Sequence, residues 1–327
     1  QGHTQAVAAI NSYRRAVAAA GAGNVSAGRS FDLFKFAKYA LGWTLVYRAI
    51  NLVGSGTSDM IVQTIKLDEA MRNVNVIAGM SEAELKAVSV RLIEMSTSAE
   101  GGLQPVQDLA QALYQINSAG IIGAESLKVL GASSRAAMAG LSDTQTAATA
   151  LISVLNAYGF SAEQAGHVSD VLFQTVKIGV PRFEDLATNI SLTATVSAAL
   201  GVSVEEMGLA WGALSRNMTD AAKTNIALSQ LMIAFLKPSE QMRAAIKLLG
   251  FDTGQAMVKQ LGFIGSLKAL YSLAGTDATV WAGLVQNRRA LQAALAFIRE
   301  EFKLSTDAAE DYGKSVDGAT SAAQREQ

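Results

Sequence analysis

Apolar residues recur along most of this chain at the three- and four-residue spacing that places them on one face of an α-helix. Two clear stretches are Val168, Val171, Leu172 and Thr175, and Leu228, Leu231, Met232 and Phe235. Each stretch predicts a helix with one buried face. The repetition of such stretches predicts an all-α fold.

A short motif separates these helices: glycine, an apolar residue, serine or aspartate, and then glutamate or glutamine three positions later. Glycine can end a helix at positive φ without a steric penalty from a Cβ atom. Serine or aspartate can cap the next helix, and the glutamate or glutamine completes a capping box. The predicted turn and cap residues are Gly79, Ser81 and Glu84; Gly140, Ser142 and Gln145; Gly159, Ser161 and Gln164; Gly201, Ser203 and Glu206; and Gly250 with Asp252 and Gln255. In a looser version, Gly179 precedes Pro181, which is predicted to occupy the first helical position.

The spacing of the turn glycines predicts how the helices are arranged. Glycines at positions 79, 102, 120, 140, 159, 179 and 201 lie 18 to 23 residues apart, which is one helix plus one tight turn. We therefore expect an array of antiparallel helices with a period of about 20 residues from about residue 81 to 250, as a bundle or a solenoid. Long flanking helices are expected, the last from about Thr276 to Leu304. Any helical protein needs regular turns, so an array without a true stacked repeat also fits the spacing.

Changes in composition predict four regions. Residues 1–28 form an N-terminal helix with a glycine-rich joint, 29–78 a long apolar or amphipathic helix, 79–304 the helical core and 305–327 a polar link. The chain opens with Gln1 rather than Met, so we interpret it as a piece of a longer protein.

The second region contains a possible membrane-interacting segment. Tyr39, Trp43 and Tyr47 lie in an apolar stretch whose only charge is Arg48. An amphipathic helix packed on protein explains the stretch, and contact with a membrane at some stage is the alternative.

Composition narrows the chemistry that is available. Half of the 327 residues are hydrophobic and only three are Pro, which favours helix. The chain has no Cys and two His, so disulfides, thiolate metal sites and histidine clusters are excluded. Net charge is −1, although residues 1–50 carry six basic side chains against one acidic. His167, Ser169 and Asp170 share one helix but cannot form a catalytic triad. We expect no enzyme activity, cofactor or metal.

From about Leu67 to Ile298, the sequence resembles the core region of tailed-phage tail tape measure proteins. The resemblance depends on the order of several pieces between Asp108 and Met242. These are Leu109–Leu113, Ser118–Gly120, Val154–Gly159, Val168–Leu172, Phe183–Ala187, Ala199–Glu206 and Leu236–Ser239.

This resemblance implies a structural and assembly protein in the tail lumen or at the tail tip of a virion. Such a protein is made in the host cytoplasm, helps to set tail length and leaves with or before the DNA. Implied partners are the tail tube protein, tail chaperones, tail-tip or baseplate hub proteins, further copies in a trimer, and the host membrane on ejection. No sequence-specific nucleic acid binding is expected. The alternatives are a membrane-active pore-forming helical protein and an α-solenoid scaffold.

Overall fold

The computed structural model describes residues 57–97, 104–140, 142–179, 182–218 and 220–299. Within these ranges the chain forms thirteen α-helices and a 3₁₀ turn, with no strand, which confirms the predicted all-α class. The predicted membrane-interacting residues, Tyr39, Trp43, Tyr47 and Arg48, lie outside the described residues. Among the helices that the structure describes, none is both long and apolar enough to cross a bilayer. The four-region division stays a prediction.

The helices follow one another with short connections. Their bounds are α4 (Thr57–Ala78), α5 (Glu82–Thr97), α6 (Val106–Ser118), α7 (Ala124–Ala139), α8 (Thr144–Tyr158), η2 (Ala162–Gln164), α9 (Ala165–Ile178), α10 (Phe183–Leu200), α11 (Val204–Ser215), α12 (Ala221–Leu236), α13 (Glu240–Leu248), α14 (Gly254–Ala274), α15 (Ala278–Leu284) and α16 (Arg288–Arg299).

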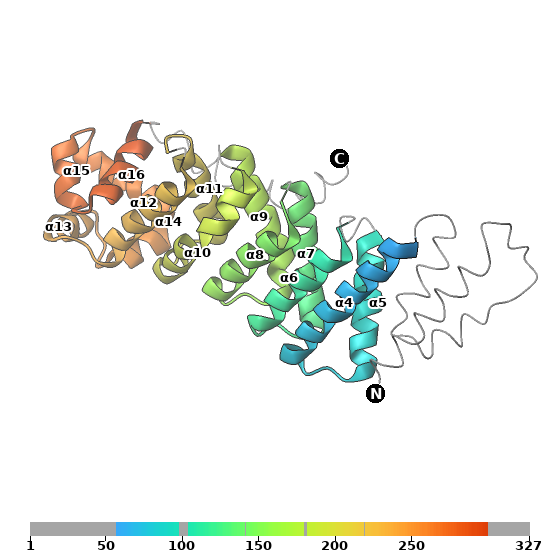
Figure 1. Cartoon of the computed structure of the whole chain (residues 1–327). Coiled ribbons are helices and arrows are strands. Elements are labelled where there is room, and N and C mark those ends of the chain that lie inside the picture. Colours follow the sequence, from blue (N-terminus) through green and yellow to red (C-terminus); the bar gives the residue numbers. More distant parts are fainter. Residues whose placement is uncertain (1–56, 98–103, 141, 180–181, 219, 300–327) are drawn as a thin grey trace, which may run out of the picture.

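The helices stack as an elongated array with α4 and α5 at one end and α13 and α15 at the other (Figure 1). One row runs from α4 through α6, α8, α10 and α12 to α16, each helix packing on the next. A second row, α7, α9 and α11, packs beside it and continues to α14. Because alternate helices along the chain are neighbours in space, the arrangement is solenoid-like.

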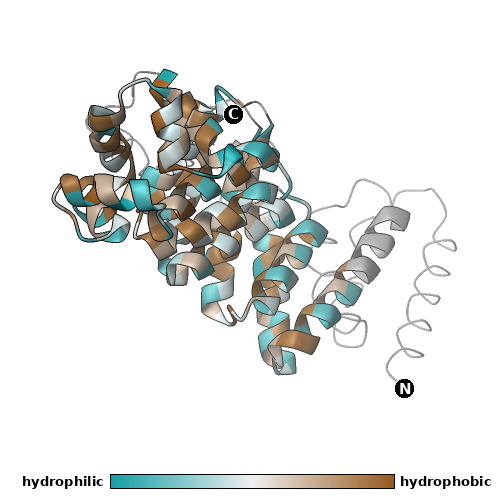
Figure 2. Cartoon of the chain, turned by 90° about the vertical axis from the view of Figure 1, so that its left-hand side faces the viewer, coloured by the Kyte–Doolittle hydropathy of each residue, from teal (hydrophilic) through white to brown (hydrophobic). Residues whose placement is uncertain are grey.

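A single apolar core runs through both rows. The predicted stripe residues of α9 and α12 are all buried, which confirms those helix faces. Apolar and polar residues alternate around the helices of the array (Figure 2), as expected where one face packs inward. Small residues bring helices close together: a Cβ at Gly212 of α11 would lie 2.5 Å from Cγ1 of Ile178 at the end of α9.

The predicted long last helix is wrong, because the chain breaks between α15 and α16. Val285 is extended, and the side chain of Asn287 starts a new helix by accepting hydrogen bonds from the amides of Arg289 (2.8 Å) and Ala290 (3.2 Å). Asparagine is one of the strongest helix caps. The same side chain donates to Oε1 of Gln230, which links the break to α12.

Candidate functional site

Ser81, Ser161 and Ser203 lie at helix starts in the structure. Oγ of Ser203 accepts from the amide of Glu206 (3.2 Å), and Ser161 forms a capping box with Gln164. In the Ser81 box, Oε2 of Glu84 accepts from the Ser81 amide (2.8 Å) and hydroxyl (2.7 Å). These bonds hold the pKa of Glu84 below its ordinary value. Gly79, Gly159, Gly201 and Gly250 adopt positive φ.

Two predicted caps are wrong because the neighbouring residue caps instead. Asp143, rather than Ser142, starts α8, and its Oδ1 accepts from the Thr146 amide (2.7 Å). A carboxylate is the stronger acceptor. Likewise, Thr253 rather than Asp252 starts α14 by accepting from the Ala256 amide (3.0 Å). Gln145 and Gln255 therefore do not complete the predicted capping boxes. Gln145 lines a groove, and the side chain of Gln255 donates a hydrogen bond to the carbonyl of Ala199.

Two predicted turn glycines serve close packing instead of positive φ. Gly140 has φ −91°, and a Cβ there would meet Cγ of Phe183 at 2.5 Å. Gly179 is extended, and a Cβ there would meet Oγ of Ser215 at 2.6 Å. Pro181 lies outside the described residues, but α10 begins at Phe183, two residues beyond the predicted position.

Glu206 does not complete the predicted capping box with Ser203. Its Oε1 instead accepts a hydrogen bond from the amide of Ile264 (2.9 Å) on α14. There the helix is kinked at Gly262, whose φ of 72° and ψ of 173° are not helical. The kink leaves a helix start inside α14, and the carboxylate of Glu206 caps it from a neighbouring helix.

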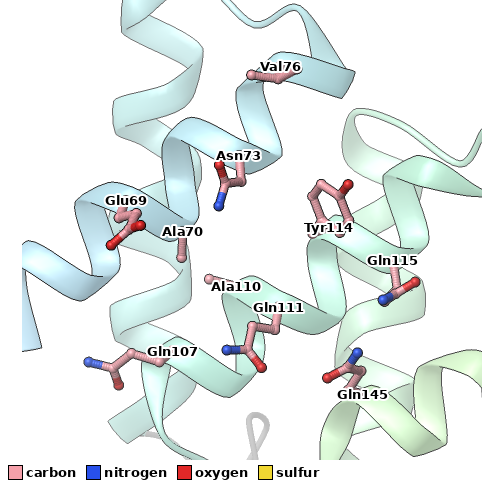
Figure 3. A pocket seen from close by; sticks show the side chains of 10 residues that line it. All are labelled: Glu69, Ala70, Asn73, Val76, Gln107, Ala110, Gln111, Tyr114, Gln115 and Gln145. Atoms are coloured by element: carbon pink, nitrogen blue, oxygen red, sulfur yellow. The ribbon is translucent and has the colours of Figure 1, made fainter.

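A groove of about 960 Å³ lies between α4 and α6. Glu69 and Val76 enter it from α4 and Tyr114 from α6 (Figure 3). Ala70, Ala110 and five amide side chains complete the lining, the amides being Asn73, Gln107, Gln111, Gln115 and Gln145. Burial and the nearby charge of Asp143 raise the pKa of Asp108, which follows Gln107 on α6. The groove thus combines exposed apolar groups, amides and negative charge.

Sequence reasoning missed this groove, although one signal for it was present. Gln107, Gln111 and Gln115 are four residues apart, which places them along one face of α6. That spacing can show a row of amides on a helix, but it cannot show that α4 lies beside the row. Which helix packs beside this row of amides depends on the tertiary fold.

No group of three or more metal-ligating side chains gathers in the described part of the chain. His167, Ser169 and Asp170 lie on α9, and Nε2 of His167 contacts Oε1 of Glu205 on α11 at 2.6 Å. Both of these side chains are about one-third exposed. The pair joins two neighbouring helices of the second row. Because the His–Glu pair links two packed helices, it supports a structural role for these two residues.

The fold and its surface define a helical structural protein: a stacked array that offers packing faces and a groove. A family model described as phage-related minor tail protein matches residues 93–294, from within α5 to within α16. This is more than half of the chain, which therefore belongs to that family, the family of phage tail tape measure proteins. The predicted resemblance is confirmed, as is the chain's place in a phage tail.

Two curated relatives have similar sequences. The tape measure protein of Pneumococcus phage Dp-1 is 27% identical over 226 residues, which is 67% of this chain and 18% of the relative. The probable tape measure protein of Clostridium phage phiCD119 is 22% identical over 161 residues, 48% of this chain and 17% of the relative. The chain thus matches less than a fifth of either relative's length and corresponds to a portion of a tape measure protein. No solved structure matches it.

Proposed function

We propose that this chain is a segment of a tape measure protein that lies in the tail lumen during assembly and contributes to tail length. The observation that carries the proposal is the family match, which extends from the end of α5 to within α16. The proposed partners are the tail tube protein around it, tail chaperones before the tube closes, and tail-tip or baseplate hub proteins at one end. Copies of the chain associate as a trimer in this proposal.

A helical chain can fill a tube much longer than its compact fold. A helix rises about 1.5 Å per residue, whereas a compact domain of this size is only about 50 Å wide. We propose that the array opens at its turns inside the tube. The positive-φ glycines Gly79, Gly159 and Gly201 lie between successive helices, where such opening would concentrate.

An in-frame deletion of α8 to α9, residues 144–178, tests the contribution to tail length in the particle that carries this protein. If the segment is extended helix in the tube, tails shorten by about 50 Å at about 1.5 Å per residue. The matched control replaces the same residues with an alanine-rich helical sequence of equal length, which should restore the original tail length. Tails of unchanged length after the deletion would overturn the proposal.

Release is tested by peptide mass spectrometry of purified particles, both intact and after triggered DNA ejection. Peptides from this chain that are present before ejection and missing afterwards would support a role in the lumen followed by release, with the host membrane as the next partner. Peptides retained in both samples would indicate a fixed component of the tail tip and contradict release.

A further inference from the structure

Charge is segregated along the array. Residues 57–220, which include α4 to α11, carry 17 acidic and nine basic side chains, whereas residues 221–299, which include α12 to α16, carry three acidic and nine basic. The net charges of these two parts of the array are 9 − 17 = −8 and 9 − 3 = +6. Opposite charge at the two ends of an elongated molecule favours association between copies.

The basic end presents an exposed helix face on α13. Met242 and Ile246 point into the core, which leaves Glu240, Arg243, Lys247 and Leu248 exposed on the outer side. Leu248 is 75% exposed, an unusual position for a large apolar residue. Neither Arg243 nor Lys247 forms an ion pair with any residue that the structure describes. The face thus combines two unpaired cations, one carboxylate and an apolar side chain.

The groove between α4 and α6, at the acidic end, offers the complementary features. Glu69 supplies a carboxylate in its wall, Asp108 lies on α6 next to Gln107, and Asp143 precedes α8, which contributes Gln145 to the lining. Val76 is 84% exposed and Tyr114 is 38% exposed, so the groove also presents apolar surface. A groove of about 960 Å³ is large enough for the side chains of one helix face.

We propose that the groove between α4 and α6 binds the exposed face of α13 from a second copy of this chain. Arg243 and Lys247 would lie toward Glu69, and Leu248 would cover Val76 or Tyr114. Because α13 and the groove lie at opposite ends of the array (Figure 1), a chain cannot fill its own groove. The contact is therefore head-to-tail, and it leaves a free groove and a free α13 for further copies. This inference does not depend on the proposed role in tail length.

The test uses the full chain and sedimentation velocity across a concentration series. The wild type is expected to form dimers and longer species, with a Kd that rises at least about tenfold between about 50 mM and about 500 mM salt because the charges are screened. Glu69→Lys is expected to remain monomeric, and so is the double variant Arg243→Gln, Lys247→Gln. The control Lys177→Glu reverses an exposed charge on α9, away from both ends, and should associate like the wild type.

Mixing the two monomeric variants gives the sharpest result. The double variant keeps an intact groove and Glu69→Lys keeps an intact α13, so the mixture is expected to form a one-to-one dimer and nothing larger. Circular dichroism of each variant checks that the fold is retained. A monomeric wild type at low salt, association that neither variant weakens, or assembly only when DNA is added would each overturn the proposal.

Discussion

At the residue scale, glycine serves two different purposes in this array. Gly159 and Gly201 end helices in the left-handed conformation that other residues rarely adopt. Gly140 and Gly212 have no such conformation and instead leave room for a side chain of a neighbouring helix. The turn glycines allow the chain to reverse direction between helices, whereas the packing glycines allow neighbouring helices to approach closely.

Gly212→Ala is expected to destabilise the fold by about 1–3 kcal/mol, as overpacking commonly does. The new Cβ would lie 2.5 Å from Cγ1 of Ile178 and 2.9 Å from the Thr175 carbonyl, so α9 and α11 must separate. Gly166→Ala on α9 is the control, since a Cβ there meets nothing within 4 Å, and it should be neutral or stabilising by up to about 1 kcal/mol. Urea denaturation measures both. Equal stability of the two variants would contradict the close approach of α9 and α11.

The capping aspartates are expected to make stability depend on pH. The amides of Thr279 and Val280 donate to Asp277 and lower its pKa below the ordinary value of 3.8. Because the folded-state pKa is depressed, the stabilisation is present above pH 3.8 and is lost as pH falls below it. Asp277→Ala should lower Tm at pH 6, and the gap to wild type should narrow below about pH 4. Asp252→Ala, which removes no cap, should show a small gap at both pH values. A gap for Asp277→Ala that is constant with pH would rule out the carboxylate cap.

At the element scale, the kink in α14 depends on a neighbouring helix. Gly262 leaves the helical conformation, and Glu206 of α11 then accepts the hydrogen bond from the amide of Ile264. A Cβ on Gly262 would lie 2.8 Å from Oε1 of the same carboxylate. The conformation of Gly262 and the capping of the helix start at Ile264 therefore both depend on Glu206, which belongs to a helix far away in the sequence.

Glu206→Ala should cost about 1–3 kcal/mol, because the part-buried amide of Ile264 loses its acceptor. Glu206→Gln retains a side-chain carbonyl oxygen and should recover most of this loss. Glu184→Ala, which removes a surface pair with Arg182 at 3.8 Å, is the control and should cost less than about 1 kcal/mol. Thermal and urea unfolding give the order of the three variants. A Gln variant as unstable as the Ala variant would show that the hydrogen bond is not the cause.

How far each element could be predicted depends on whether its signal is local. The apolar stripes of α9 and α12 and the serine caps at Ser81 and Ser203 depend on residues within one or two turns. The kink at Gly262 depends on Glu206, 56 positions earlier, and the break before α16 depends partly on the contact from Asn287 to Gln230. The groove likewise requires α4 beside α6. Local patterns can predict helices and their faces, but not which distant side chain ends or bends a helix.

At the scale of the whole molecule, the array has a continuous core, but no described helix packs against all of the others. Each helix of the first row packs mainly on its neighbours in that row and on the adjacent helix of the second row. In such stacked folds, stability is approximately a sum of local units and the interfaces between them. The ends are therefore expected to open at a lower free energy than the middle.

The two buried tryptophans provide a matched test of this expectation. Trp281 on α15 lies near one end, where α15 packs on α13 and α16, whereas Trp211 on α11 lies in the middle of the array. Each is at most 1% exposed, and truncation to Ala should cost about 3–5 kcal/mol locally. Hydrogen exchange followed by mass spectrometry should show that Trp281→Ala loses protection in α13, α15 and α16 while α6 to α10 keep theirs. Trp211→Ala should instead lose protection in α9 to α12 and also in α14 and α16, because α11 packs on all of them. Equal loss along the whole array in both variants would mean that it unfolds as one cooperative unit, and the local opening on which the proposed unrolling in the tube depends would then have no energetic basis.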